Sequence, residues 1–205
     1  MLNSSGFNTW ADGYDRSTAQ SDADGSYPFA GYNEILGEIC RRVLENGSED
    51  VLDIGFGTGA LTARLYARGC RIYGQDFSER MIELAREKMP EATLVCGDFT
   101  QGLAEELKEH RYDAIIATYS LHHLTDAQKV TFIQSLLPLL REGGAIHIGD
   151  VAFATRDELE ACRVQSGERW DNDEIYFVYD ELKKTFPAMT FDRFSPCSGI
   201  LSLRK

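Results

Sequence analysis

The stretch Val51-Leu-Asp-Ile-Gly-Phe-Gly-Thr-Gly59 decides the fold of this 205-residue chain. Its first half is an apolar run that predicts a buried strand, and its second half carries glycine at every other position. Glycine lets the backbone turn tightly and approach a ligand without a Cβ in the way. An amphipathic segment with Leu61 and Leu65 follows. The stretch therefore predicts a strand, a glycine-rich turn and the amino end of a helix, whose free amide groups suit an anionic or polar ligand.

Apolar strands alternate with amphipathic helices on both sides of this turn. The expected strands are 50–54, 71–75, 93–96, 113–118 and 145–148, and the expected helices are 32–45, 59–68, 79–88, 103–109, 125–140, 155–167 and 179–186. Ser78, Thr125 and Thr155 stand where helix N-caps are expected. This alternation predicts a parallel sheet with helices on both faces, which is the doubly wound α/β class.

The C-terminal part ends in two further expected strands, 189–194 and 200–203. The link between them is too short for a crossover helix, so the two strands are expected to be antiparallel neighbours. The length fits a single domain over residues 1–205. We expect it to consist of an N-terminal cap segment (1–45), a cofactor-binding core (46–150), and a substrate-side lid with the terminal strands (151–205).

Charge and cysteine usage exclude several classes of function. The formal net charge is -12, so a nucleic acid would be repelled by the average field of the protein. The five cysteines are scattered without a C-x-x-C pair, which argues against a disulfide framework and against a metal site. No apolar stretch reaches the roughly 18 residues of a membrane helix, and the first residues do not form a signal peptide. We therefore expect a cytoplasmic protein with no nucleic-acid or membrane partner.

The glycine turn alone leaves the ligand open. Gly55, Gly57 and Ala60 also satisfy the dinucleotide pattern G-x-G-x-x-G/A. Asp76 ends the second expected strand, where a carboxylate accepts both hydroxyls of a ribose. The motif and Asp76 together indicate a cofactor that contains adenosine, either NAD or S-adenosylmethionine.

Three features favour S-adenosylmethionine. Asp53 lies inside the first strand, where a buried carboxylate is costly unless a cation such as the ammonium of a methionine moiety pairs with it. Asp98, after the third strand, stands where it can accept a hydrogen bond from an adenine amino group, with Phe99 beside it. The antiparallel terminal strand pair is the third feature, because the plain dinucleotide fold lacks it.

Val51–Gly59, Asp76, Gly97-Asp98, and the stretches 112–124 and 139–150 resemble, in order, the motifs of class I S-adenosylmethionine-dependent methyltransferases. The resemblance implies a Rossmann-like, seven-stranded sheet of order 3-2-1-4-5-7-6 with strand 7 antiparallel. It implies S-adenosylmethionine as cofactor and S-adenosylhomocysteine as product. A narrower likeness, at 118–126 and 149–153, is to the YrrT-like methyltransferase group of Gram-positive bacteria.

The resemblance also implies which residues bind the cofactor. Asp53 and the turn residues border the methionine part, Asp76 the ribose and Asp98 the adenine. Tyr119 is expected as a wall near the methionine, and Tyr14 belongs to an N-terminal segment that folds over the cofactor in this family. The full expected set is Tyr14, Asp53, Gly55, Phe56, Gly57, Gly59, Asp76, Phe77, Asp98, Phe99, Thr118 and Tyr119.

Methyl transfer from a sulfonium is an in-line displacement, so the protein mainly has to position donor and acceptor. A base is needed only if the acceptor must lose a proton, so the motif assigns no catalytic residue. The candidates are His122, His123, Asp150 and Tyr14. Each also has a structural explanation: the histidines in packing and loop orientation, Asp150 in capping a loop, and Tyr14 in anchoring its segment. Adjacent loop residues point in different directions, so we expect only one histidine to face the cleft.

The acceptor is expected to be a small molecule. After the fourth strand the chain reads Ala117-Thr-Tyr-Ser120 in place of the Asn/Asp-Pro-Pro-Tyr/Phe motif that holds the target amine in related nucleic-acid methyltransferases. The protein is expected to be a monomer or a homodimer. The alternatives are a non-catalytic S-adenosylmethionine-binding protein and an NAD-dependent reductase.

Overall fold

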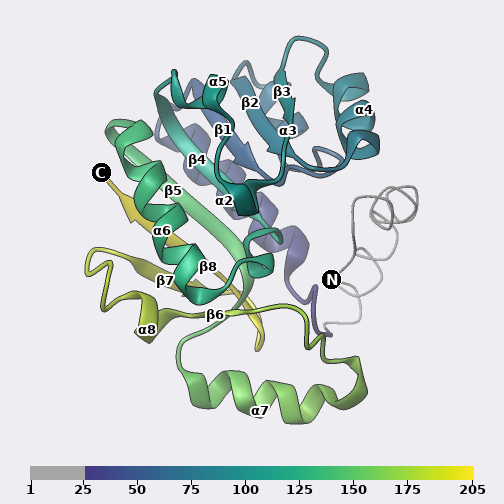
Figure 1. Cartoon of the computed structure of the whole chain (residues 1–205), viewed down its shortest axis with the longest axis vertical. Helices are drawn as coiled ribbons and strands as arrows, with labels where there is room; N and C mark the ends of the chain where they lie inside the picture. Colours follow the sequence, from purple (N-terminus) through teal and green to yellow (C-terminus); the bar gives the residue numbers. More distant parts are fainter. Residues whose placement is uncertain (1–25) are drawn as a thin grey trace.

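The computed structural model describes residues 26–205, which form one α/β fold (Figure 1). The helices are α2 (Tyr32–Glu45), α3 (Thr62–Tyr66), α4 (Glu79–Lys88), α5 (Glu105–Lys108), α6 (Asp126–Leu136), α7 (Arg156–Ser166) and α8 (Tyr179–Leu182). The strands are β1 (Asp50–Ile54), β2 (Arg71–Asp76), β3 (Thr93–Cys96), β4 (Tyr112–Thr118), β5 (Leu140–Phe153), β6 (Phe177–Val178), β7 (Thr190–Arg193) and β8 (Ser198–Arg204). Short 3-10 turns include η1 (Phe99–Gln101) and η2 (Leu121–His123).

The strand order in the sheet is β3-β2-β1-β4-β5-β8-β7. All neighbours from β3 to β5 are parallel, whereas β8 runs antiparallel to both β5 and β7. Since β7 and β8 are the sixth and seventh strands of the prediction, the order 3-2-1-4-5-7-6 with a reversed last strand is confirmed. The short β6 is an eighth strand that was not predicted, and it pairs with the end of β5.

Helices cover both faces of the sheet, because strands such as β1 have apolar side chains on both faces. All residues of β1 are buried, and successive side chains of a strand point to opposite faces. Val51 packs in the same apolar cluster as Ile39 of α2, whereas Leu52 packs with Phe132 of α6. Accordingly α2, α3 and α4 lie against one face, and α5, α6 and α8 against the other (Figure 1). Within residues 26–205, none of the helices has both the length and the apolar character needed to cross a membrane.

Local capping follows the sequence closely, whereas element lengths differ. The side chains of Ser78, Thr125 and Thr155 each accept a hydrogen bond from the backbone of the following helix, as predicted. The strand predicted at 145–148 is too short, since β5 extends over Leu140–Phe153. Its extra length is supported by long-range pairing, because β8 pairs along Ala145–Val151 and β6 pairs beyond it. The helices predicted at 59–68 and 179–186 are too long, since only α3 and α8 form there.

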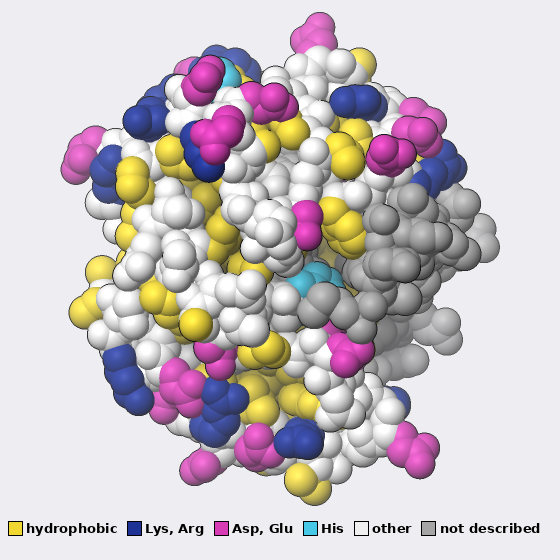
Figure 2. Space-filling model, in the orientation of Figure 1, with side chains coloured by type: hydrophobic (Ala, Val, Ile, Leu, Met, Phe, Trp, Pro, Cys, Tyr) yellow, Lys and Arg dark blue, Asp and Glu magenta, His cyan; other side chains and the backbone are white. Residues whose placement is uncertain are grey.

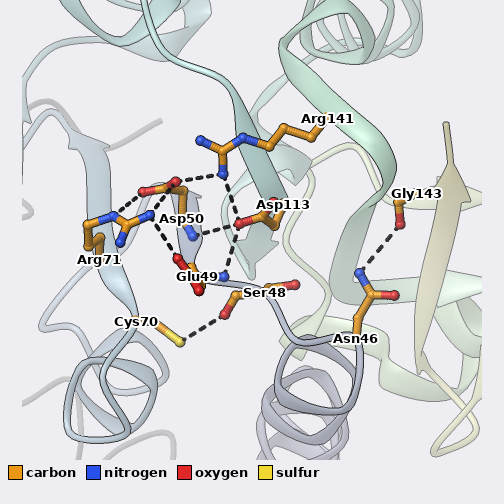
Figure 3. A network of polar contacts seen from close by, with 9 residues as sticks. All are labelled: Asn46, Ser48, Glu49, Asp50, Cys70, Arg71, Asp113, Arg141 and Gly143. Carbon is orange, nitrogen blue, oxygen red and sulfur yellow. Dashed lines mark hydrogen bonds and ion pairs between the residues drawn. The ribbon is translucent and has the colours of Figure 1, made fainter.

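A charged network joins the amino ends of four neighbouring strands (Figure 3). Asp50 on β1 lies between two guanidinium groups, 2.6 Å from Nε of Arg71 on β2 and 2.6 Å from Nη1 of Arg141 on β5. Asp113 on β4 accepts hydrogen bonds from the backbone N–H groups of Glu49 and Asp50 and from Arg141. The hydrogen bond from Arg71 is the largest cause that lowers the pKa of Asp50. The network joins the strands at the edge of the sheet opposite the glycine turn.

Candidate active site

The glycine turn has the backbone that the sequence predicts. Gly55, Gly57 and Gly59 have φ angles of 70°, 56° and 76°, a left-handed conformation that other residues adopt only with strain. At Gly55 space is limited as well, because a Cβ there would lie 2.5 Å from the Cβ of Ser120. At Gly57 a Cβ would meet nothing within 4 Å, so this glycine is needed for its backbone and leaves open space beside it.

A cleft lies beside this turn at the carboxyl edge of the sheet. β1 and β4 are neighbours there, and their connections leave on opposite sides, which is where ligands bind in doubly wound folds. Figure 2 shows a hollow near the middle of this face, bordered by hydrophobic and acidic side chains with a histidine at its edge. The cleft is lined by Tyr32, Gly55, Phe56, Gly57, Thr58, Ala60, Leu61, Asp76, Phe77, Met81, Phe99, Thr118, Tyr119, Ser120 and His123.

The sequence predicts most, but not all, of this lining. Gly55, Phe56, Gly57, Asp76, Phe77, Phe99, Thr118, Tyr119 and His123 were predicted site residues and line the cleft. Of the other predicted residues, Asp53, Gly59, Asp98, His122 and Asp150 are not part of its lining. Tyr14 lies outside the described residues. Tyr32, Met81 and Ser120 were not predicted, because each looks like an ordinary helix, core or loop residue in the sequence.

Asp76 ends β2 with its carboxylate in the cleft wall and only 5% of its surface exposed. Oδ2 accepts a hydrogen bond from Gly57 N at 2.8 Å, and Oδ1 accepts one from Ser78 N at 2.9 Å. Burial raises the pKa of Asp76, while these backbone hydrogen bonds oppose the rise. Each carboxylate oxygen can accept more than one hydrogen bond, so the group can still bind a diol.

Asp53 lies behind the turn and is 1% exposed. Its Oδ1 has no hydrogen-bond partner among the residues that the structure describes. Burial and the nearby charge of Asp76 raise the pKa of Asp53 to about 8, and the neighbouring Thr62 hydroxyl opposes this only partly. Burying such a carboxyl group without a charged partner destabilises the folded protein. A strongly raised pKa of this kind is typical of functional sites.

Asp98 and Phe99 follow β3 and lie in different environments. Asp98 is exposed, and its Oδ1 accepts a hydrogen bond from Thr100 N at 2.9 Å, so that it caps η1. Phe99 is buried and lines the cleft. Together with Phe77 and Met81 it provides the apolar surface that an adenine ring requires.

Tyr119 is the one non-glycine residue with a positive φ angle, 50°, in the described part of the chain. Strained backbone of this kind is concentrated at functional sites. Its ring contacts those of Phe29 and Tyr32, at centroid distances of 5.3 and 5.1 Å, and its hydroxyl finds no hydrogen-bond partner among residues 26–205. Burial and the charge of Asp150 raise the pKa of Tyr119.

The two adjacent histidines differ in their relation to the cleft. His123 lines the cleft, whereas His122 is 6% exposed and lies behind it. His122 Nδ1 is 2.7 Å from Asp150 Oδ1, and Nε2 is 3.3 Å from Glu174 Oε1. Burial lowers the pKa of His123 to about 4, so this ring is neutral at pH 7. Glu174 lies between α7 and β6 and was not among the predicted site residues.

The segment before β6 folds back over η2 and closes this side of the site. Ile175 N donates to His122 O at 2.8 Å. The Trp170 ring stacks on Tyr27 and meets Tyr176 edge-on, at centroid distances of 5.1 and 4.9 Å. This segment therefore packs at the carboxyl edge of the sheet, next to the cleft.

Comparisons with known proteins agree on a methyltransferase. Residues 51–144 match the family described as a methyltransferase domain. An uncharacterized methyltransferase of Anoxybacillus flavithermus is 36% identical over 183 residues, which are 89% of this chain and 83% of that protein. One from Geobacillus thermodenitrificans is 37% identical, over 88% of this chain and 84% of that protein.

Solved structures show the same fold. Magnesium protoporphyrin IX methyltransferase from Synechocystis PCC 6803, with bound S-adenosylhomocysteine, matches with a TM-score of 0.67 and 21% identity over 95% of this chain and 94% of that one. The N-methyltransferase NodS from Bradyrhizobium japonicum WM9, also bound to S-adenosylhomocysteine, matches with a TM-score of 0.63 and 20% identity, covering 93% and 97%.

The sheet order, the glycine turn and the extent of these matches define one class of enzyme. The chain belongs to the class I S-adenosylmethionine-dependent methyltransferases. Within this class its sequence is similar to the methyltransferases of Anoxybacillus and Geobacillus along nearly its whole length.

Proposed function

We propose that this enzyme transfers the methyl group of S-adenosylmethionine to a small-molecule acceptor by in-line displacement. The observation that carries the proposal is the presence of two carboxyl groups beside the glycine turn: Asp76 in the cleft wall, and the buried Asp53 behind it, whose Oδ1 has no hydrogen-bond partner among the described residues. When bound, the cofactor supplies an activated methyl group, so the main task of the protein is to position donor and acceptor.

The residues of the cleft suit the three parts of the cofactor. Asp76 accepts the two ribose hydroxyls, and Asp53 provides the negative charge that balances the methionine ammonium, directly or through water. Phe77 and Phe99 enclose the adenine, and Asp98 accepts a hydrogen bond from its amino group. The methionine part is bordered by Gly55, Phe56, Gly57, Gly59, Thr118 and Tyr119.

The acceptor side lies toward η2 and the segment before β6. His122, His123 and Asp150 are the described candidates for a catalytic role there, and Tyr14 is a fourth from the sequence. The net charge of -12 supports a small-molecule acceptor over a nucleic acid.

We propose one functional unit over residues 1–205, with a cap (1–45), a cofactor-binding core (46–150), and a lid with terminal strands (151–205). A monomer or a homodimer suits this arrangement. A cytoplasmic location is supported by the cysteines, all five of which are free thiols.

Two measurements test the proposal. Isothermal titration should show binding of S-adenosylmethionine and S-adenosylhomocysteine and none of NAD, whereas the reverse result would refute it. Incubation with methyl-labelled cofactor and a cell extract, followed by size fractionation, should place the label in the low-molecular-weight fraction. Label in nucleic acid or protein would refute a small-molecule acceptor, and binding without turnover would indicate a non-catalytic binding protein.

A further inference from the structure

We propose that His122, His123 and Glu174 form a binding site for a divalent transition-metal ion such as Zn²⁺, on the acceptor side of the cofactor cleft. Metal binding itself is independent of the proposed function, whereas the role of the ion in activating the acceptor rests on it.

The three side chains converge on one point. Each offers one ligand atom, and these atoms all lie within 4.8 Å of one another. His122 Nε2 and Glu174 Oε1 are 3.3 Å apart. Zinc–ligand distances of about 2.0–2.2 Å in a tetrahedral site put neighbouring ligands roughly 3.3 Å apart, so this pair already has the required spacing. The His122 and His123 ring centroids are 4.4 Å apart, so a small side-chain adjustment brings in the third ligand.

Hydrogen bonds at their remote atoms orient two of the three ligands, His122 and Glu174. His122 Nδ1 is held by Asp150 Oδ1 at 2.7 Å, which leaves Nε2 to face Glu174. The Tyr176 hydroxyl donates to Glu174 Oε2 at 2.7 Å, which leaves Oε1 to face His122. Histidines and carboxylates that bind metal ions in proteins have this kind of support at their remote atoms. The hydrogen bond from Ile175 N to His122 O also holds the segment before β6 against η2, and so fixes the distance between His122 and Glu174.

The same contacts between His122, Asp150 and Glu174 would suit a protonated imidazole between two carboxylates. Such an ion pair needs no second imidazole, yet His123 places a ring nitrogen within 4.8 Å of the other two ligand atoms. Two imidazoles and a carboxylate are a donor set typical of Zn²⁺ and related transition metals, and they favour these over Mg²⁺ or Ca²⁺. Three protein ligands also leave a coordination position for a substrate.

The location connects the site to methyl transfer, because His123 also lines the cofactor cleft. An acceptor hydroxyl or thiol that coordinates here would lose its proton to solvent, since a divalent ion stabilises the anion. The oxygen or sulfur would then form the new bond to the methyl carbon. The carbon–sulfonium bond breaks, and its electron pair stays on the sulfur of S-adenosylhomocysteine. The acceptor class is therefore a small molecule with an acidifiable hydroxyl or thiol group.

Titration of the metal-free, full-length protein with ZnCl₂ tests the site directly. We expect one equivalent to bind with micromolar or tighter affinity, and CoCl₂ to give the intense visible absorption of a four-coordinate complex. Glu174→Gln keeps the shape of the side chain and His123→Asn removes a ligand, and each should weaken Zn²⁺ binding at least tenfold. Asp150→Asn acts through His122 and should cost about 10–100-fold in Zn²⁺ affinity.

His110→Asn is the matched control, because His110 is exposed and packs against Tyr73 at the other end of the sheet. It should leave Zn²⁺ affinity unchanged. The proposal is overturned if the wild type binds no stoichiometric Zn²⁺, or if Glu174→Gln and His123→Asn bind it like the wild type. If both variants fail to fold, the wild-type Co²⁺ spectrum decides, since its absence overturns the site. Parallel titration with S-adenosylhomocysteine separates this outcome from failure of the proposed function, because either ligand can bind without the other.

Discussion

Replacing Asp53 by asparagine is expected to stabilise the cofactor-free protein while weakening its affinity for S-adenosylmethionine. Asp53 is 1% exposed, and its Oδ1 has no hydrogen-bond partner among the described residues. The Asp53 carboxyl group lowers the stability of the folded protein, and its presence is explained if its negative charge binds the cofactor. Asparagine has nearly the same shape but cannot ionise, so the variant separates the cost of the charge from the packing of the side chain.

The structure gives the size and the sign of this effect. The pKa of Asp53 is about 8 in the folded protein, against an ordinary value of 3.8. At pH 7 the folded state therefore keeps a proton that the unfolded chain has released, and stability falls as pH rises from 3.8 to about 8. At about 1.4 kcal/mol for each pH unit, the roughly three units up to pH 7 cost the folded state about 4 kcal/mol. An asparagine amide with an unmet hydrogen bond costs about 1–3 kcal/mol instead, so the net gain is about 1–3 kcal/mol.

Urea unfolding of the wild type and Asp53→Asn between pH 5 and pH 9, without cofactor, measures this difference. The free energies of unfolding should be nearly equal at about pH 5, diverge by roughly 1.4 kcal/mol per pH unit, and stop diverging above about pH 8. Asp180→Asn, at an exposed position on α8, is the control and should follow the wild type. A difference that does not vary with pH would mean that Asp53 is not a buried, unpaired acid. Unchanged affinity of the variant for S-adenosylhomocysteine would refute the pairing with the cofactor ammonium.

Three further predictions concern the cleft and the opposite edge of the sheet. Asp76→Asn should weaken S-adenosylhomocysteine binding at least tenfold in isothermal titration, because it disturbs the partners of two ribose hydroxyls, and equal affinity would remove Asp76 from the site. Gly55→Ala should cost more stability in urea unfolding than Gly57→Ala, since both strain the backbone by about 1–2 kcal/mol but only the Cβ at Gly55 also meets Ser120, at 2.5 Å. Equal losses would argue against that contact. Asp113→Asn should lower stability by about 1 kcal/mol at pH 7, a small value because Arg141 is 43% exposed and screened. Because the pKa values of Asp50 and Asp113 are lowered, their contribution is present above the usual carboxyl range and is lost as pH falls below it, so the variant should lose less stability on acidification than the wild type.

The parts of the fold that the sequence predicts are those that depend on local chemistry. The apolar run at Asp50–Ile54 gives β1 with the same bounds in the structure, and Thr125 is the predicted N-cap, where it forms a capping box with Gln128. The alternation of strands and helices predicts the parallel part of the sheet, and the short link between β7 and β8 allows only an antiparallel pair. These features need only the periodicity of side chains and the hydrogen bonds of nearby residues. The strand order itself was implied by the resemblance to a known family.

Element lengths were less predictable because distant partners set them. Nothing around Leu140 or Phe153 marks them as the ends of β5, which reaches these residues by pairing with β4, β8 and β6. In the same way, β6 has only two residues and exists because it lies beside the end of β5. A strand of this length has no sequence period to detect.

The sequence by itself determined the class of enzyme and identified most of the residues that line the cleft. The glycines of the turn and the carboxyl groups at strand ends lie close together in the fold, because the carboxyl ends of parallel strands meet at one edge of the sheet. Only the tertiary structure decided which histidine lines the cleft, because the packing of the segment before β6 against η2 fixes the position of both side chains. It alone joined His122 to Glu174, 52 positions apart in the chain. Contacts between distant residues come from packing and leave no pattern in the sequence around either residue.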